Sequence, residues 1–516
     1  MPGAPLERSF IDELDRDIHS SGAAKAAVFA PFTGEKIHDL PLSTSYDVTD
    51  AAAAARAAQS SWHDSGFAHR RRVLLRAHDL LLERRELLLD AIQQETGKTR
   101  GQAFEEVFIG ASTTRYYAVS AKSALRPRAR RAGIPLVIRT HVGYRPKGVV
   151  GVITPWNYPL SLALFDVIPA LAAGNGVVQK ADNQGAVSIL AARRAFIDAG
   201  VPAELWAVVT GDGEEIGNAV VDAADYVCFT GSTATGKKVA ARAATTITGA
   251  SLELGGKNPM IVLDDVDPQK AARNAVYACF ASLGQLCVSI ERIYVQRSVA
   301  DAFIAEFTER TAALVQGPAF DYTTDVGSLT LPSQFERVRT HVDDAVAKGA
   351  AVLTGGRARP DLGPLFFEPT VLANVTDDMD CARNETFGPV VAITLVDSVE
   401  QAVQAANDSE FGLSASIFSG SVRRARRVAR QIDAGSVNIN EGYRATFSSV
   451  DAPMGGVKQS GLGRRNGREG ILRFVDARTV ANATGLMTLP RTGTEFAKVG
   501  GLMIVLLVVL KAIRRR

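Results

Sequence analysis

The sequence has few of the residues on which disulfide and metal chemistry depend. Its 516 residues include only four cysteines and seven histidines. The cysteines are Cys228, Cys279, Cys287 and Cys381, and no two of them form a CxxC pair. We therefore expect neither a disulfide framework nor a zinc or other metal site, and we expect a reducing, cytoplasmic compartment.

A strong net charge and an N-terminal apolar segment are also lacking. The formal net charge is +3, which is small for this length and argues against nucleic acid as a partner. The N-terminus has no apolar run, so we expect no secretory signal. Hydrophobic and charged contents of 46% and 22% are typical of a globular enzyme, and the length favours two or three domains.

One long apolar run stands near the C-terminus. Val499–Leu510, VGGLMIVLLVVL, has 12 residues without a charge and is followed by Lys511 and Arg514–Arg516. A helix of this length is about 18 Å long, shorter than the ~30 Å hydrocarbon core of a bilayer. Two interpretations stay open: residues 499–516 attach peripherally to the inner face of a membrane, or they pack on a neighbouring subunit.

The first third of the chain is predicted to be mainly helical. Residues 1–24 are polar and are expected to form a loose arm. The apolar spacing then predicts helices over 48–62, 69–97 and 103–125, with Gly97 as a C-cap, and a strand over 133–144.

From Gly148 the chain alternates β-branched runs with helical patterns. Strands are expected at 149–154, 177–180, 206–210, 226–229 and 251–254, with helices at 160–172, 186–199, 214–222 and 234–244. A second alternating unit begins at 260. The fold class is therefore α/β, with two doubly wound open-sheet domains, the first Rossmann-like. Ligands bind at the carboxyl ends of such strands, where the polar and small residues are Asn157, Lys180, Gly211, Gly231, Ser232 and Glu253.

A glycine-rich turn, FTGSTATG at 229–236, follows one of these strands and opens a helix. Backbone N–H groups at such a helix start can hold a pyrophosphate. The turn lacks the GxGxxG spacing. A strand-to-helix turn also needs glycine where no ligand binds, so the glycines alone do not predict a phosphate site. The signal gains weight from Lys180 at the end of the neighbouring strand.

Three polar residues have the types needed for acyl chemistry. Cys287 follows a predicted helix in a loop, where a thiol can have a lowered pKa and act as a thiolate. Glu253 precedes Gly255 and Gly256 and can act as a base. Asn157 lies between prolines and can donate to an oxyanion. The other cysteines are interpreted as core residues.

The motifs that carry these residues resemble those of the aldehyde dehydrogenase superfamily over residues 30–485. They are TPWNYPL (154–160), FTGS (229–232), ELGGKNP (253–259), GQLC (284–287), ETFGP (385–389) and GGVKQSGLGR (455–464). The resemblance implies Cys287 as nucleophile, Glu253 as general base, and Asn157 with the Cys287 backbone N–H as oxyanion hole. It implies cofactor contacts at Thr154, Pro155, Trp156, Lys180, Asn183, Gly211, Gly231, Ser232, Leu254, Glu385 and Phe387.

The resemblance further implies NAD(P)-dependent oxidation of an aldehyde to an acid through a cysteine thiohemiacetal and thioester. Many members have a glutamate on the adenosine ribose at the position of Asn183. A neutral amide there would not repel a 2′-phosphate, and Lys180 would attract it. NADP is therefore expected, with NAD as the alternative, although Asp182 weakens this expectation.

The substrate is expected from the segments GQLCVSIERIYV and SSVDAPMGGVKQSGLGR, which look most like the succinate-semialdehyde dehydrogenase branch. Ser449 matches that branch, but its two arginine positions hold Phe165 and Ala281. Arg444 is a substitute candidate, and Arg292 is expected in a strand away from the pocket. The predicted substrate contacts are Phe165, Tyr443, Arg444 and Ser449.

The alternative substrate is a fatty or aromatic aldehyde delivered from a membrane. An apolar tunnel for it would be lined by Trp156, Tyr158, Phe165, Tyr443 and Phe447. A function of another class, an inactive homologue that serves as a binding protein, is disfavoured because the nucleophile, base and oxyanion donor are all present.

The predicted domain organisation completes these expectations. Residues 25–127 and 147–256 would bind NAD(P), and 257–450 would form the catalytic domain. Residues 128–146 and 470–487 resemble the family's small β oligomerisation element, which implies a homodimer or homotetramer. Residues 488–516 would form a hydrophobic and basic tail.

Overall fold

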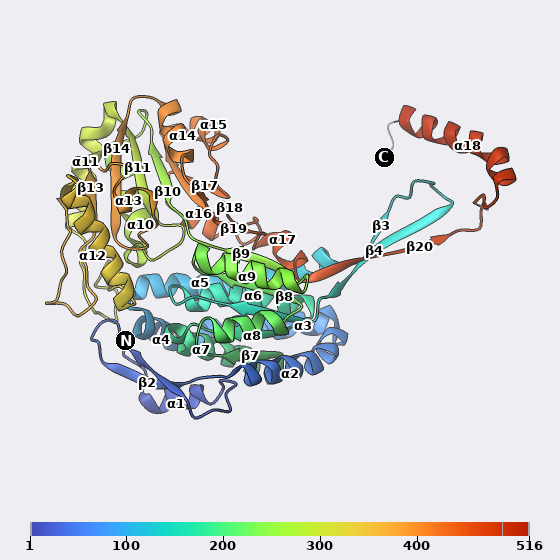
Figure 1. Ribbon diagram of the computed structural model, residues 1–516, viewed down its shortest axis with the longest axis horizontal. Helices are drawn as coiled ribbons and strands as arrows, with labels where there is room; N and C mark the ends of the chain where they lie inside the picture. Colours follow the sequence, from blue (N-terminus) through green and yellow to red (C-terminus); the bar gives the residue numbers. More distant parts are fainter. Residues whose placement is uncertain (1–2, 488, 514–516) are drawn as a thin grey trace.

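A computed structural model of the chain describes residues 3–487 and 489–513. It shows two α/β units side by side and a narrow arm that extends away from both, with a helix at its far end (Figure 1). The two units and the arm correspond to three separate sheets.

The first unit is a six-stranded sheet that is parallel except at one edge. Its order is β19 (Gly461–Leu462), β9 (Gly249–Glu253), β8 (Tyr226–Thr230), β5 (Val149–Ile153), β6 (Gly176–Lys180) and β7 (Trp206–Val209), with β19 antiparallel to β9. The chain builds outward from β5 in both directions. The strand order therefore reverses between β5 and β8, the point at which open α/β sheets bind ligands.

Helices accompany this sheet as the sequence predicts. They are α2 (Ser45–Asp64), α3 (Gly66–Glu83), α4 (Arg85–Thr96), α5 (Arg100–Leu125), α6 (Pro159–Ala173), α7 (Ala186–Ala199), α8 (Glu215–Ala223) and α9 (Thr233–Thr245). The single helix expected over 69–97 is instead two, because Arg84 departs from helical geometry with φ −97° and ψ 15°. Gly97 caps α4 in the left-handed conformation, as predicted.

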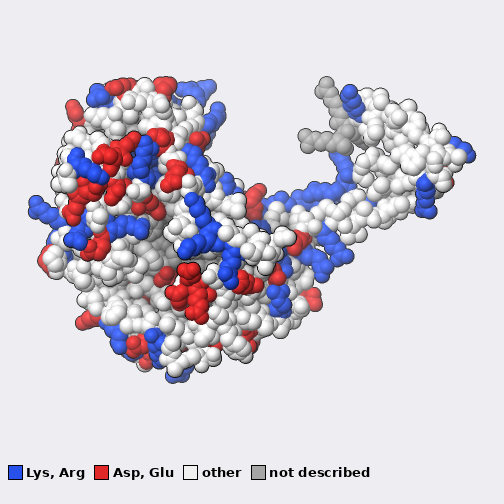
Figure 2. Space-filling model, in the orientation of Figure 1, with Lys and Arg blue, Asp and Glu red and all other residues white. Residues whose placement is uncertain are grey.

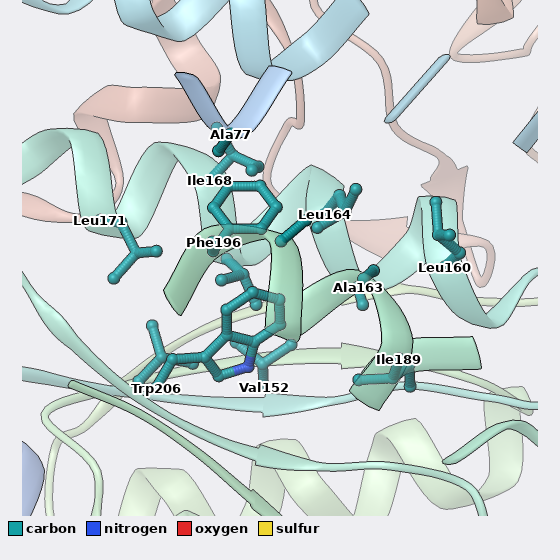
Figure 3. Close-up of a cluster of buried hydrophobic side chains, with 14 of the residues drawn as sticks. Ala77, Val152, Leu160, Ala163, Leu164, Ile168, Leu171, Ile189, Phe196 and Trp206 are labelled. Carbon is teal, nitrogen blue, oxygen red and sulfur yellow. The ribbon is translucent and has the colours of Figure 1, made fainter. Parts of the chain in front are cut away.

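The core of the first unit forms between α6 and the sheet. All of α6 is buried, and Phe196 of α7 packs edge-on against Trp206 of β7 with ring centroids 5.4 Å apart (Figure 3). The Trp206 indole donates to the Gln179 side chain at 2.9 Å, which satisfies its one polar atom. Gly110 of α5 faces Leu164 so closely that a Cβ would lie 2.8 Å from its Cδ1, and glycine thus permits the two helices to approach.

The second unit is a seven-stranded sheet that is also parallel except at one edge. Its order is β12 (Ala351–Thr354), β13 (Thr370–Ala373), β14 (Val390–Val396), β11 (Ile290–Gln296), β10 (Asn258–Val262), β16 (Ser414–Phe418) and β17 (Ser436–Ile439), with β12 antiparallel. The longer helices of this unit are α10 (Pro268–Phe280), α11 (Arg297–Ala312), α12 (Pro332–Ala347), α14 (Val399–Asn407) and α15 (Val422–Ala429). The predicted fold class of two doubly wound sheets is confirmed.

The expected loose N-terminal arm is wrong for residues 8–18. Arg8–Asp15 forms α1, which buries Ile11 and Leu14. Arg194 of α7 holds this segment by ion pairs to Glu13 and Asp17. The polar composition concealed a short amphipathic helix that packs on the first unit. The paired strands β1 (Lys25–Phe29) and β2 (Lys36–Pro41) follow it.

The arm is a three-stranded antiparallel sheet in the order β20 (Val475–Ala483), β4 (Ile138–Pro146) and β3 (Arg128–Arg130). β20 and β4 pair continuously from Val475 opposite Pro146 to Ala483 opposite Ile138. The strand predicted from residue 133 begins only at Ile138. β20 forms one edge of this sheet.

Beyond the arm lies α18 (Gly493–Ala512), a helix of 20 residues with mean hydropathy 1.9 over its most apolar window and no buried residue (Figure 1). The apolar run of 12 residues is thus part of a helix about 30 Å long. By length and composition it meets the requirement for crossing a membrane, a weak indication when it stands alone. Arg514–Arg516 lie outside the described residues.

Truncating a core side chain tests this description of the first unit. Leu164→Ala should lower the free energy of unfolding by about 2–5 kcal/mol, because it removes buried methyl groups where α5 and α6 meet. Leu82→Ala on α3, at a side chain that is 40% exposed, is the control and should change it little. A thermal unfolding curve compares the two. Equal melting temperatures would contradict the packing described.

Candidate functional site

Two connected cavities collect most of the residues that the sequence singles out. A cavity of 240 Å³ is lined by Cys287, Glu253 and Asn157. A larger one of 750 Å³ is lined by Lys180 and by the start of α9. Five residues line both, so the cavities are continuous: Pro155, Trp156, Thr230, Gly231 and Ser232.

Cys287 lies in a turn after α10, at the boundary between the two units. The preceding single turn, Ala281–Gly284, has Ser282 and Leu283 at positive φ of 51° and 53°. Gly284 is required there, because a Cβ would lie 2.1 Å from the Gly388 carbonyl oxygen. The Asn258 side chain donates to the Cys287 carbonyl at 2.8 Å and fixes the turn.

The Cys287 thiol is neutral in this arrangement. Burial raises its pKa to about 12, and the carboxylates of Glu253 and Glu385 add to this effect. The expectation that position alone lowers this pKa is therefore wrong. A loop or helix terminus lowers a thiol pKa only where it supplies positive charge, and here desolvation and two nearby carboxylates outweigh that contribution. A base must remove the proton before the sulfur can attack.

Glu253 ends β9 and has the properties of such a base. It is 5% exposed, and its Oε1 atom has no hydrogen-bond partner among the described residues. Burial raises its pKa to about 7. Near neutral pH the carboxyl group can therefore both accept and release a proton.

Asn157 lies at the carboxyl end of the β5 segment and is buried. Its amide donates to the Gln285 carbonyl at 2.9 Å, two residues before Cys287. Its own carbonyl accepts from Lys98 at 2.7 Å. Lys98 in turn pairs with Glu106 in the core. Sequence analysis missed this Lys98–Glu106 pair, because no spacing or motif connects the start of α5 with Asn157.

The larger cavity has the features of a dinucleotide site. Ser232 caps α9 by accepting from the Thr235 backbone N–H at 3.2 Å, so the glycine-rich turn opens a helix as predicted. The positive end of that helix faces the cavity, which suits a pyrophosphate. Thr154, Pro155, Trp156, Lys180 and Gly231 line it as expected.

Two predicted cofactor residues do not line either cavity. The Asn183 side chain accepts from the Gly211 backbone N–H at 3.0 Å, so both are engaged with each other. Asp182, Asp212 and Lys238 line the larger cavity in their place. The sequence pattern alone gave no signal for Lys238, which follows the glycine-rich turn on α9.

Leu254, Glu385 and Phe387 line the smaller cavity, as predicted. Glu385 accepts from the Gly256 backbone N–H at 2.8 Å, and burial raises its pKa to about 8. Phe387 has a positive φ of 54° and packs edge-on against Trp156 at 5.6 Å. The buried Glu291, paired with Lys257, holds this strained loop by accepting from the Phe387 backbone N–H at 2.8 Å, which sequence reasoning missed.

The residues predicted to line an apolar tunnel are close together only in part, and those that are pack as a cluster and line neither cavity. Tyr158, Phe165, Tyr443 and Phe447 belong to one buried cluster against which Cys287 packs. Trp156 lies on the cofactor side instead. Two tyrosine hydroxyls at the edge of this cluster, those of Tyr443 and Tyr277, donate to Glu105 at 2.8 and 2.6 Å.

The candidate contacts for a substrate carboxylate, two arginines and a serine, differ in position, and none of them lines either of the two cavities. Arg444 is paired with Glu441 and lies over the Tyr277 ring at 4.1 Å, next to the aromatic cluster. Ser449 is exposed and donates to the Ala445 carbonyl. Arg292 lies in β11 and donates to backbone carbonyls of Lys257, Ala405 and Ala406. The prediction that Arg292 stands away from the pocket is confirmed.

Comparison with known proteins agrees with this geometry. Residues 18–480 match the model of the aldehyde dehydrogenase family. The chain is 49% identical over 462 residues to "Putative succinate-semialdehyde dehydrogenase, NADP(+)" of Mycolicibacterium smegmatis, covering 90% of this chain and 89% of that protein. It is 40% identical over 455 residues to the mitochondrial succinate-semialdehyde dehydrogenase of Arabidopsis thaliana, covering 87% and 84%.

A solved structure shows the same architecture. Betaine aldehyde dehydrogenase from Staphylococcus aureus in complex with NAD+ superposes with a TM-score of 0.88 at 31% identity, covering 94% of this chain and 99% of that one. The family match, the two curated relatives and this structure all cover both units and the residues at the junction of the cavities. The chain therefore belongs to the aldehyde dehydrogenase family.

Proposed function

We propose that the chain oxidises an aldehyde to a carboxylic acid, with Cys287 as nucleophile, Glu253 as base and Asn157 as oxyanion donor. The observation that carries this proposal is the meeting of a half-buried thiol with a buried carboxyl group, whose Oε1 has no hydrogen-bond partner among the described residues, in a cavity that adjoins the larger one. Each role depends on a contact or a pKa that burial produces.

The reaction follows from these positions. Glu253 removes the Sγ–H proton of Cys287, and the sulfur adds to the aldehyde carbon. The Asn157 amide and the Cys287 backbone N–H stabilise the oxygen anion that forms. A bound nicotinamide would supply the hydride acceptor, so that the adduct on Cys287 would become a thioester. Once the thioester has formed, Glu253 gives the sulfur's proton up to solvent. It then takes a proton from the attacking water and returns it to the departing Cys287 sulfur as the acid is released.

The preferred cofactor in this proposal is NADP. The names of the most similar bacterial relatives include NADP+. Lys180 and Lys238 line the cavity and would attract a 2′-phosphate, whereas Asp182 and Asp212 oppose it. The site residues proposed for the adenosine end are accordingly Lys180, Lys238 and Ser232, with NAD as a second cofactor.

The preferred substrate is succinate semialdehyde, which the relatives from Mycolicibacterium and Arabidopsis have in their names. Arg444 and Ser449 are the proposed carboxylate contacts, at the edge of the aromatic cluster. An apolar aldehyde is the second candidate, because Phe165 and Phe447 lie in the cluster that Cys287 touches and neither can pair with a carboxylate.

We propose the same division of labour that the sequence predicts. Residues 25–127 and 147–256 would bind the cofactor, and 257–450 would carry the nucleophile. The arm of residues 128–146 and 470–487 would join subunits into a dimer or tetramer, because β20 offers an unpaired strand edge. The working compartment would be the cytoplasm.

Peripheral attachment to the inner face of a membrane through residues 499–516 is also proposed. Between Lys498 and Lys511 every face of α18 is apolar, so one groove on a partner subunit would leave part of it in water. Residues 126–147 of the arm contain seven Lys and Arg and no Asp or Glu. Arg130, Arg131 and Arg139 share a cavity with Leu510 of α18, which places positive charge beside the apolar helix (Figure 2). Anionic headgroups fit this combination.

Removal of the oxyanion donor tests the catalytic assignment. Asn157→Ala should cut kcat roughly 10²–10³-fold, because an oxyanion donor is lost while the cofactor cavity is unchanged. Stopped-flow rates and nucleotide binding are measured together, with Asn482→Ala, at an exposed residue of β20 that lines neither cavity, as the control. Unaltered turnover with normal nucleotide affinity would refute the role of Asn157.

A substrate and cofactor panel tests the proposed specificity. Succinate semialdehyde should give a higher kcat/KM than hexanal, decanal or benzaldehyde, and NADP+ a higher value than NAD+. Arg444→Met should raise KM for succinate semialdehyde about tenfold or more and leave hexanal unaffected, since it removes a charge and little volume. A preference for hexanal or decanal would favour the apolar candidate instead.

Vesicle sedimentation tests the tail. The full-length protein should sediment with vesicles that contain phosphatidylglycerol and much less with phosphatidylcholine alone. The double variant Val505→Glu with Val508→Glu should stay in solution, because two carboxylates would enter the apolar phase. Ile247→Glu, at a residue that is 94% exposed on the first unit, is the control. If the unmodified protein does not sediment with either kind of vesicle, and if it forms an oligomer that the double variant does not form, then α18 belongs to a subunit interface.

A further inference from the structure

Three buried charged side chains stand next to Glu253 and take no direct part in the proposed chemistry. Asp166 lies on α6, and Arg465 and Arg473 flank α17 (Gly467–Leu472). Their side chains are 0%, 2% and 7% exposed. Arg465 grips Asp166 with two hydrogen bonds of 3.0 and 2.6 Å, and Arg473 donates to the same carboxylate. Two guanidinium groups on one carboxylate leave a net positive charge in the interior.

This group of Asp166, Arg465 and Arg473 is tied to the two strands that position Glu253. Arg465 donates to the Thr230 hydroxyl, and Thr230 is the residue opposite Glu253 in the pairing of β8 with β9. Arg473 donates to the Ser251 hydroxyl at 2.7 Å, two residues before Glu253 on β9. The positive charge is therefore held at a fixed place beside the base and does not pair with it directly.

We propose that Arg465 and Arg473 are positioning residues that act on Glu253 through their charge, from places fixed by their bonds to β8 and β9, and that Asp166 moderates this effect. The inference rests on the proposed role of Glu253 as base. In this proposal Arg465, Arg473 and Asp166 touch neither the substrate nor the cofactor, and they act on the reaction only through Glu253.

The charges around Glu253 support this assignment. Glu253 is surrounded by charged side chains from several elements. The cations are Arg465 and Arg473 at the two ends of α17 and Arg464 in the loop after β19. The anion is Asp166 on α6, and the Cys287 thiol, which Glu385 also influences, is the remaining titratable neighbour. Burial raises the Glu253 pKa, Arg465 opposes the rise most, Arg473 next, and Asp166 adds to it. Without the cations, burial would leave the base protonated at neutral pH and unable to act.

Substitution of each member should move the pH profile in a direction set by its charge. Arg465→Gln removes a positive charge, so the Glu253 pKa rises and the acid limb of kcat should move up by about one pH unit. With a pKa that moves from about 7 to about 8, activity at pH 7 then falls about fivefold and recovers toward pH 9. Asp166→Asn removes a negative charge and should move the same limb downward. If Arg465 and Asp166 were only structural, both variants would lose activity, but their acid limbs would not move in opposite directions.

Two further variants serve as controls. Arg465→Lys keeps the charge and loses the forked hydrogen bonds, so its acid limb should stay near that of the unmodified protein. Arg468→Gln removes an arginine of the same segment that is not among the charges facing Glu253, and its profile should not move. Melting temperatures identify any variant that fails to fold, and Arg473 still pairs with Asp166 in Arg465→Gln.

The pH dependence of Cys287 alkylation by iodoacetamide gives a second readout, and Glu253→Gln separates the two levels of the argument. If Glu253→Gln makes acid at the normal rate, the proposed base is wrong and the inference falls with it. If Glu253→Gln is impaired but Arg465→Gln and Asp166→Asn leave the acid limb in place, or move it the same way, only the role of the charged group is overturned.

Discussion

Desolvation of Glu253 and Cys287 in one small cavity is the constraint on which the rest of the site depends. Burial makes the thiol a poor acid and the carboxylate a better base, with pKa values of about 12 and about 7. The two shifts make proton transfer from sulfur to oxygen unfavourable at rest. An aldehyde that captures the sulfur as it ionises would draw the transfer forward, so the thiol is protected until a substrate is present.

The two units supply different parts of this arrangement. Glu253 ends a strand of the first sheet, and Cys287 follows a helix of the second, so neither unit holds a complete site. The Asn157 amide bridges them through the Gln285 carbonyl. The buried Lys98 donates to the Asn157 backbone carbonyl and is itself paired with the buried Glu106, so this ion pair holds the Asn157 backbone in place. Loss of either charge would leave the other unpaired in the core, where an isolated charge is costly.

The sequence was sufficient for the fold class because strand ends and glycine turns follow local rules. The alternation after Gly148 gave five strands and four helices near their true bounds, and FTGSTATG gave the start of α9. Local rules failed where tertiary contacts decide. Arg84 breaks a periodic helix, and α1 is held by apolar residues that contact the first unit, which composition does not reveal. The lowered pKa expected for Cys287 failed for a similar reason, since desolvation depends on which residues surround the sulfur.

The continuity of chain between the site and the arm has a consequence for assembly. Arg473 bonds to Asp166 and Ser251, and β20 begins two residues later at Val475. In the proposed oligomer, docking of another subunit along the free edge of β20 would act on Arg473 through one intervening residue, Phe474. The proposed assembly and the proton affinity of Glu253 would then depend on the same short segment of chain.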